Sequence, residues 1–144
     1  MKNSLKPGLA ATRRFTIDRA RTIDFMGDDG RVYATPMLVR DLENTCREFL
    51  LEHLDPGEDS VGTRVELDHM AATLEGMWVE FTARLVELDG RRAVFEFSAR
   101  DPVDDVARGR HARFVVDTAK TVQRLKAKAE KAVAQSPAPP AGGG

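Results

Sequence analysis

The sequence predicts an α+β fold in which one antiparallel sheet is covered on one face by a single long helix. Three observations predict it: an amphipathic helical pattern after Thr35, four strand-like segments after Gly57, and a short hairpin turn at Asp89-Gly90. Such layers bury the apolar face of a sheet against the apolar stripe of a helix. The 144 residues are enough for one domain with a core of its own.

The N-terminal third begins with a polar stretch. Residues 1–12 contain Pro7 and Gly8, and we expect them to form a flexible arm. Residues 14–25 mix apolar and polar side chains in short order, which indicates a first strand. The sequence GDDGR at 27–31 is typical of a turn-rich loop.

The clearest helix start in the chain is Thr35-Pro36. Threonine is a good N-cap residue, and proline is favoured at the first helical position. The residues that follow carry a stripe at spacings of three and four, which predicts an amphipathic helix. The stripe consists of Leu38, Leu42, Thr45, Cys46, Phe49 and Leu50. We expect the helix to end near Leu54, because the sequence DPG that follows cannot continue it.

The second half of the chain reads as four antiparallel strands and a terminal helix. The strands are expected at residues 61–70, 77–88, 93–100 and 106–116, and the helix at 118–133. The predicted boundaries are a flexible arm at 1–12, one domain at 13–134 and a disordered Pro/Gly-rich tail at 135–144. A single sheet of this kind has exposed edges, which favours a homodimer.

Composition excludes several classes of function. The formal net charge of −1 gives no electrostatic reason to bind nucleic acid or an anionic membrane. Three histidines and one cysteine supply no metal-binding framework and no intrachain disulfide, so we expect no metal and no cofactor. Because there is no signal peptide and no apolar run long enough to span a bilayer, a cytoplasmic location is expected.

Three polar residues stand out as candidates for chemistry, and each has a structural alternative. Glu43 lies next to the apolar stripe of the helix, where a carboxylate suits general-base catalysis, or it pairs with Arg47 one turn later. His69 faces the apolar side of its strand, either as a catalyst or as a hydrogen-bonded core residue. Thr35 is either a plain N-cap or a hydroxyl at a helix end that stabilises an oxyanion.

Three further residues are ambiguous on position. Cys46 is a possible nucleophile, but it lies mid-helix on the apolar side with nothing to lower its pKa, so a buried core cysteine is the better interpretation. His111 and Arg113 share one face of the last strand and by themselves indicate no function.

Several separated stretches are informative in combination. They are YAT followed by a helix with Glu43 eight residues after Thr35, then LDPGEDSVGT, VELDHMAATLEGM, LDGRRAVFEFSARD and GRHARFVV. In this combination they resemble the fluoroacetyl-CoA thioesterase family of hotdog enzymes, over roughly residues 13–125. The resemblance implies a sheet wrapped around one long central helix and the hydrolysis of an acyl-CoA thioester to a carboxylate and free CoA. It also implies a dimer with CoA along the subunit interface.

The resemblance also implies roles for single residues. Thr35, Glu43 and His69 match the catalytic threonine, glutamate and histidine of the family. Gly62 matches a glycine whose backbone contacts the thioester, and Arg113 matches an arginine of the site region. The choice between a covalent Thr35 intermediate and direct attack by water stays open.

The match is poor just before Thr35, where residues 25–33 are short and acidic and Tyr33 is the expected aromatic side chain near the site. We therefore expect Tyr33 to contact the substrate and an acyl group other than fluoroacetyl. Two other functions fit a hotdog fold. One is a non-catalytic acyl-CoA-binding or regulatory protein, and the other is an enoyl-CoA hydratase, whose signature ending in asparagine-proline-histidine is missing here.

Overall fold

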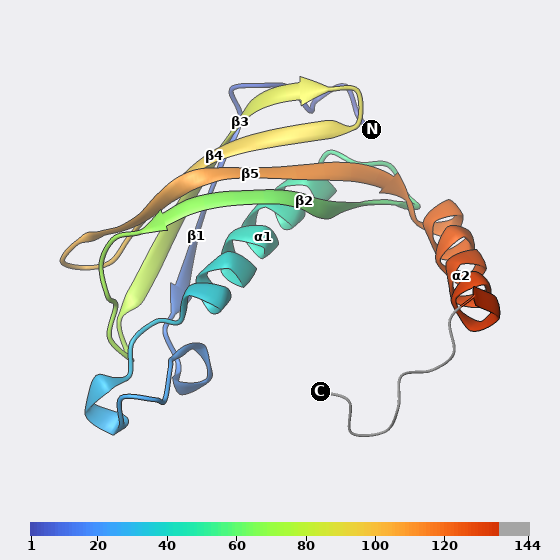
Figure 1. Cartoon of the computed structure of the whole chain (residues 1–144). Coiled ribbons are helices and arrows are strands. Elements are labelled where there is room, and N and C mark those ends of the chain that lie inside the picture. Colours follow the sequence, from blue (N-terminus) through green and yellow to red (C-terminus); the bar gives the residue numbers. More distant parts are fainter. Residues whose placement is uncertain (136–144) are drawn as a thin grey trace.

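The structure is a computed structural model that describes residues 1–135. Five strands form one antiparallel sheet in the order β1-β3-β4-β5-β2, and the sheet curves around the helix α1 (Figure 1). The elements are β1 (Ala10–Thr16), α1 (Thr35–Leu51), β2 (Glu58–His69), β3 (Trp78–Asp89), β4 (Arg92–Arg100), β5 (Asp105–Asp117) and α2 (Thr118–Gln135), with 3₁₀ turns at Arg19–Arg21 and Asp28–Gly30. The predicted α+β hotdog arrangement is confirmed.

The core lies between α1 and the concave face of the sheet. All six residues of the predicted helix stripe are buried. Phe49 of α1 meets Phe95 of β4 edge to face, with ring centroids 5.7 Å apart. Burial of one such side chain contributes about 1.5–3 kcal/mol. This packing holds α1 at a fixed height under the sheet and so places its polar residues.

The start of α1 differs from the prediction by one residue. Ala34 is the N-cap and has no side chain that can cap, Thr35 is the first helical residue, and Pro36 follows it. The N–H groups of Met37 and Leu38 both donate to the carbonyl oxygen of Ala34. Pro36 has no N–H, so one unsatisfied donor of the first turn is absent. The helix therefore starts without using the Thr35 hydroxyl.

The far end of α1 also differs. The helix ends at Leu51 rather than near Leu54. The N–H of His53 donates to the carbonyl oxygen of Leu50, and that of Leu54 to Leu51. These i to i−3 contacts tighten the last turn before the DPG sequence, as is common at helix ends.

The N-terminal prediction is wrong in two places. The first strand begins at Ala10 and ends at Thr16, so part of the expected arm is strand and the expected strand stops early. Beyond it, the Asp18 side chain accepts a hydrogen bond from the Arg21 N–H and stabilises a 3₁₀ turn instead. Leu5 is buried, because the start of the chain lies against the end of α1. Of the expected tail, Gln135 ends α2 and 136–144 lie outside the described residues.

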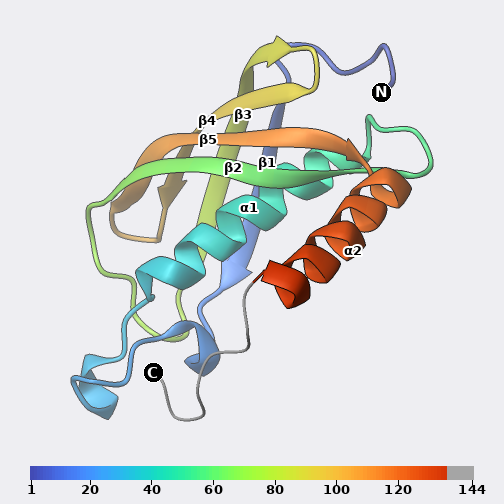
Figure 2. The ribbon, with the colours of Figure 1, turned by 45° about the vertical axis from the view of Figure 1, so that its right-hand side comes forward.

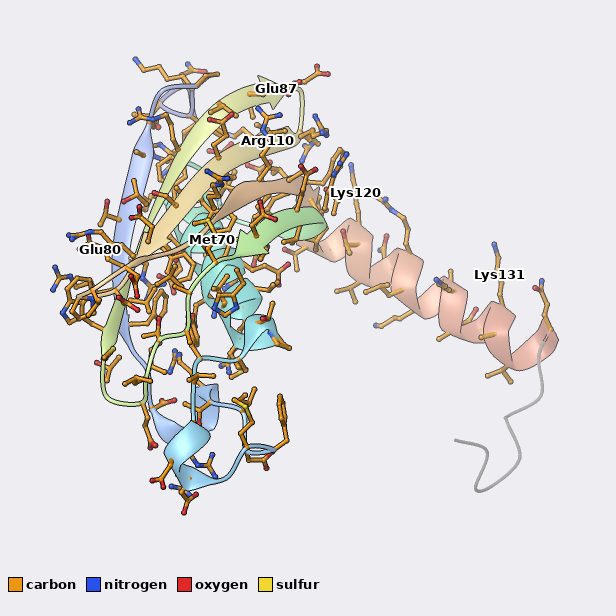
Figure 3. All side chains as sticks on the ribbon, turned by 60° about the vertical axis from the view of Figure 1, so that its left-hand side comes forward. Met70, Glu80, Glu87, Arg110, Lys120 and Lys131 are labelled. Carbon is orange, nitrogen blue, oxygen red and sulfur yellow. The ribbon has the colours of Figure 1, made fainter. Side chains whose placement is uncertain are left out.

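The four later strands and the terminal helix are confirmed to within a few residues. Gly90 has a φ of 58° in the turn between β3 and β4, a conformation that glycine adopts without strain. β2 is an edge strand, and its pairing with β5 contains a register shift between Gly62 and Arg64. α2 leaves the sheet at the end of β5 and has no buried residue (Figures 2 and 3).

Candidate active site

Thr35 and His69 form a direct contact between the start of α1 and the end of β2. Thr35 Oγ1 lies 2.8 Å from His69 Nδ1. The two residues are 34 positions apart in the sequence. They meet because β2 runs antiparallel to β5 over α1 and ends above the helix start. The alternative interpretation of Thr35 as a plain cap is thus wrong, and its hydroxyl is available to a neighbour.

The electrostatics of His69 suit a proton acceptor. Burial lowers its pKa from the usual value, and the nearby backbone of Ala71 opposes this in part. The imidazole is therefore neutral near pH 7. Its Nε2 is buried and has no hydrogen-bond partner within residues 1–135. With the proton on Nε2, Nδ1 accepts the hydrogen bond from the Thr35 hydroxyl.

An open hollow of about 320 Å³ lies beside this pair. It is lined mostly by apolar groups, namely Ile23, Phe25, Val32, Tyr33, Ala34, Thr35, His69, Met70, Ala71 and Ala72. The prediction that Tyr33 is the one aromatic side chain near the site is wrong, since Phe25 also lines the hollow. Phe25 is 79% exposed on the segment between β1 and α1. An apolar hollow beside two polar groups is typical of a binding site for a small organic group.

Tyr33 has a structural role that the sequence did not reveal. Its hydroxyl donates to Asp41 Oδ2 at 2.5 Å, and the ring is buried. Arg21 donates to both carboxylate oxygens of Asp41, at 2.9 and 3.1 Å. Burial, with the Asp41 carboxylate beside it, raises the pKa of Tyr33 far above its usual value. Contact of Tyr33 with substrate stays a prediction, and it would involve the ring edge rather than the hydroxyl.

Glu43 lies in a second group of polar residues, farther along α1. Its Oε1 is 3.9 Å from Arg113 Nη1, and its side chain is 41% exposed. Arg47, the partner proposed by the structural alternative, instead binds Asp59 through two hydrogen bonds of 3.0 and 2.7 Å. A Cβ atom at Gly62 would collide with the Glu43 carboxylate. Glycine at this position therefore leaves the space in which Glu43 lies.

Arg113 and His111 of β5 are both buried behind Glu43. The Arg113 guanidinium donates to Ser60 Oγ and to the Ser60 carbonyl oxygen, each at 2.8 Å. Its Nη1 lies 3.2 Å from His111 Nε2. Burial lowers the pKa of His111 and of Arg113 from their usual values. The strand face that these two residues share therefore points into the molecule.

The two polar groups are separate within one chain. Thr35 and Glu43 are eight residues apart on α1, and at a rise of about 1.5 Å per residue they lie roughly 12 Å apart along the helix. The structure thus joins Thr35 to His69 and joins Glu43 to Gly62 and Arg113, but it does not bring Glu43 to Thr35.

Cys46 is fully buried in the core, and burial raises the pKa of its thiol to about 12. A thiol with this pKa is protonated near pH 7 and is a poor nucleophile. The interpretation as a core cysteine is confirmed. Within residues 1–135, no group of His, Cys, Asp and Glu side chains is arranged to hold a metal ion, and no helix is long and apolar enough to cross a membrane.

Comparison with known proteins places this site in a family. Residues 17–119 match the family described as fluoroacetyl-CoA-specific thioesterase. A fluoroacetyl-CoA thioesterase of Streptantibioticus cattleyicolor is 31% identical in an alignment of 135 residues that covers 89% of this chain and 97% of the relative. The chain belongs to the fluoroacetyl-CoA-specific thioesterase family. The expected hotdog thioesterase relationship is confirmed, and with it a thioester hydrolase.

Solved structures of thioesterases share the architecture. The fluoroacetyl-CoA thioesterase superposes with a TM-score of 0.81 at 30% identity, covering 88% of this chain and 98% of that chain. A thioesterase superfamily member from Thermus thermophilus superposes with a TM-score of 0.83 at 26% identity, covering 92% of this chain and 99% of that chain. The match therefore extends over almost the whole length of both proteins.

Proposed function

We propose that this protein hydrolyses an acyl-CoA thioester to a carboxylate and free CoA, with Thr35, Glu43 and His69 as the catalytic set. The observation that carries the proposal is the 2.8 Å contact between Thr35 Oγ1 and His69 Nδ1 at the mouth of an apolar hollow. One solved structure of the related thioesterase is a complex with fluoroacetate and CoA, in a variant whose phenylalanine is replaced by alanine. That complex supports an acyl-CoA as the substrate class.

Thioester hydrolysis needs an oxygen nucleophile, a proton acceptor and stabilisation of the oxyanion. The attacking oxygen forms a bond to the carbonyl carbon, the C–S bond breaks, and the CoA thiolate leaves and takes up a proton. Neutral His69 is positioned to accept the proton of the Thr35 hydroxyl, or of a water molecule held there. The Thr35 N–H at the positive end of the α1 dipole is a suitable donor for the oxyanion.

Glu43 reaches this pair only from another subunit, so the proposal includes a homodimer. β2 is an edge strand that exposes Val61 and Val65, and such edges pair readily with a second strand. Antiparallel pairing of two β2 strands centred between Val65 and Glu66 puts Gly62 opposite the partner's His69. Glu43, which adjoins Gly62, then faces the Thr35–His69 pair of the other chain. Two equivalent sites result from the two-fold symmetry.

The acyl end of the substrate fits the apolar hollow. Its wall carries Phe25 from the β1–α1 segment and Met70 to Ala72 from the segment after β2. These side chains are compatible with an apolar acyl group and supply no positive charge for an acyl group that carries a second carboxylate. Fluoroacetyl-CoA is the substrate named for the relative, and it is one member of the panel to be tested.

The decisive experiment measures thiol release from a panel of acyl-CoA thioesters that runs from acetyl and fluoroacetyl to aromatic and long-chain acyl groups. We expect turnover of at least one member by the wild type and a large loss for His69→Ala and Glu43→Ala. Absence of turnover across the panel, with acyl-CoA binding intact by calorimetry, would show a binding protein instead of an enzyme. Rapid quenching and mass spectrometry of intact protein would reveal any acyl group on Thr35.

A further inference from the structure

Three side chains converge on the space above the Cα of Gly62. A Cβ atom added there would meet Glu43 Oε1 from α1, His111 Cε1 at 3.2 Å and Arg113 Nη1 at 3.5 Å. Glu43 is part of the proposed catalytic set, whereas no role in the reaction falls to His111. A fully buried histidine beside a catalytic carboxylate requires an explanation, because its polar atoms must find partners in the fold.

The contacts of His111 define its protonation state. Nε2 faces Arg113 Nη1, which is a donor and never an acceptor, so Nε2 must accept. Nδ1 therefore carries the proton and donates to the carbonyl oxygen of Arg64 at 2.8 Å. Burial lowers the pKa of His111 and keeps this neutral form dominant near pH 7. His111 is thus a fixed acceptor between β2 and β5.

The orientation of the Arg113 guanidinium follows from three contacts. The Ser60 hydroxyl oxygen accepts from Nε, and the Ser60 carbonyl oxygen accepts from Nη2. His111 Nε2 accepts from Nη1. Nη1 also lies 3.9 Å from Glu43 Oε1, which is within ion-pair distance. Since the guanidinium is planar and rigid, fixing three of its five N–H groups fixes the direction of the others.

From this arrangement we infer that His111 is a positioning residue for Glu43, acting through Arg113. His111 holds Nη1 of Arg113 in place, and the guanidinium in turn holds the Glu43 carboxylate over Gly62, where it faces the second subunit. The inference rests on the proposed function, since it assigns His111 to the same reaction. His111 itself does not touch the substrate.

The test is a double-mutant cycle on the full-length protein. His111→Leu removes both polar contacts, whereas His111→Gln keeps one acceptor for Arg113 and one donor for the Arg64 carbonyl. We expect His111→Leu to lower kcat at least tenfold with little change in KM, and His111→Gln to restore most of the loss. In a Glu43→Gln background, His111→Leu should lower kcat by less than twofold, because two residues that act as one unit are not additive.

Two outcomes would overturn the inference. One is a full tenfold loss on adding His111→Leu to Glu43→Gln, which would mean an independent contribution to activity or folding. The other is unchanged kcat for His111→Leu while the variant melts at a temperature close to that of the wild type. A variant that fails to fold is replaced by His111→Gln and His111→Asn, which differ in the reach of the acceptor.

A second measurement does not depend on turnover. Nitrogen NMR of labelled protein reports which ring nitrogen of His111 carries the proton, and we expect a protonated Nδ1 and an accepting Nε2 at pH 7. A protonated Nε2 would exclude the bond to Arg113 and end the inference even if the enzyme is active. Conversely, the expected tautomer in a protein that hydrolyses no thioester would refute the proposed function, and with it a role of His111 in that reaction, while the His111–Arg113 contact itself would stand.

Discussion

The Thr35 hydroxyl lies 2.8 Å from Nδ1 of His69, and it is not used to cap the helix that it begins. A change of this side chain should therefore affect the reaction without weakening α1. Thr35→Ser should therefore retain substantial kcat, while Thr35→Ala should lose about 10²-fold or more, as expected for a lost nucleophile or proton relay. Thermal melting of both variants should stay near that of the wild type. A large fall in melting temperature for Thr35→Ala would instead indicate a capping role.

The pH dependence of the reaction follows from the lowered pKa of His69. Only neutral His69 can accept a proton, and burial disfavours its charged form. The neutral form thus persists to a lower pH than for a free histidine, whose pKa is 6.5. We expect kcat/KM to rise with pH and to reach half its maximum below pH 6.5. A rise centred above pH 7 would contradict the assignment of His69 as the base.

Mixing two inactive variants tests the site between subunits. Thr35→Ala and Glu43→Gln each leave both sites of their own homodimer with only a small residual kcat. If Glu43 serves the partner's Thr35, a mixed dimer holds one intact site. Statistical exchange after mixing equal amounts should therefore restore roughly a quarter of wild-type activity, since half of the dimers are mixed. No recovery after verified subunit exchange would place Glu43 and Thr35 in one chain's site. Glu48→Gln, on the same helix, is the matched control and should remain active.

Gly62→Ala should act on Glu43 rather than on the strand. The added methyl group would collide with the Glu43 carboxylate and displace it, while its next contacts, His111 Cε1 at 3.2 Å and Arg113 Nη1 at 3.5 Å, are less close. β2 is an edge strand that tolerates a Cβ atom. We expect the melting temperature to change by only a few degrees and kcat to fall at least tenfold. Wild-type kcat in Gly62→Ala would show that the position of Glu43 over Gly62 is not needed.

Tyr33→Phe distinguishes a structural from a substrate-binding role. The change removes the hydrogen bond to Asp41, which keeps its two contacts with Arg21, and it should reduce the free energy of unfolding by about 1 kcal/mol. KM for the best acyl-CoA should stay within twofold of the wild type, because the ring edge remains. A KM raised tenfold, without loss of stability, would favour direct contact of the hydroxyl with substrate.

Most of the helices and strands could be predicted from the sequence, but the contacts of the buried polar residues could not. Alternation and helical spacing depend on each residue and its near neighbours, so the strands after Gly57 and the stripe from Leu38 to Leu50 were predictable. The Asp18 side-chain bond that ends the first strand early depends on a competition between local hydrogen bonds, which periodicity does not register.

The sequence did not show which charged side chains are buried. Asp41 lies on the same helix face as Leu38, Leu42 and Thr45, a position from which its burial could have been inferred. Its partners Arg21 and Tyr33 lie 20 and 8 residues before it, outside the helix, and no spacing rule connects them to Asp41. The same holds for Arg113, whose contact with Ser60 arises from the pairing of β2 with β5.

The Arg21–Asp41–Tyr33 contact fastens both ends of the β1–α1 segment to the first turns of α1. Phe25 and Met26, at 79% and 56% exposure, lie on the span between those ends. Insertions or substitutions in this span would alter the wall of the hollow without moving the Thr35 backbone. A few exposed residues of this span can therefore change the shape of the hollow, while the contact between Thr35 and His69 stays in place.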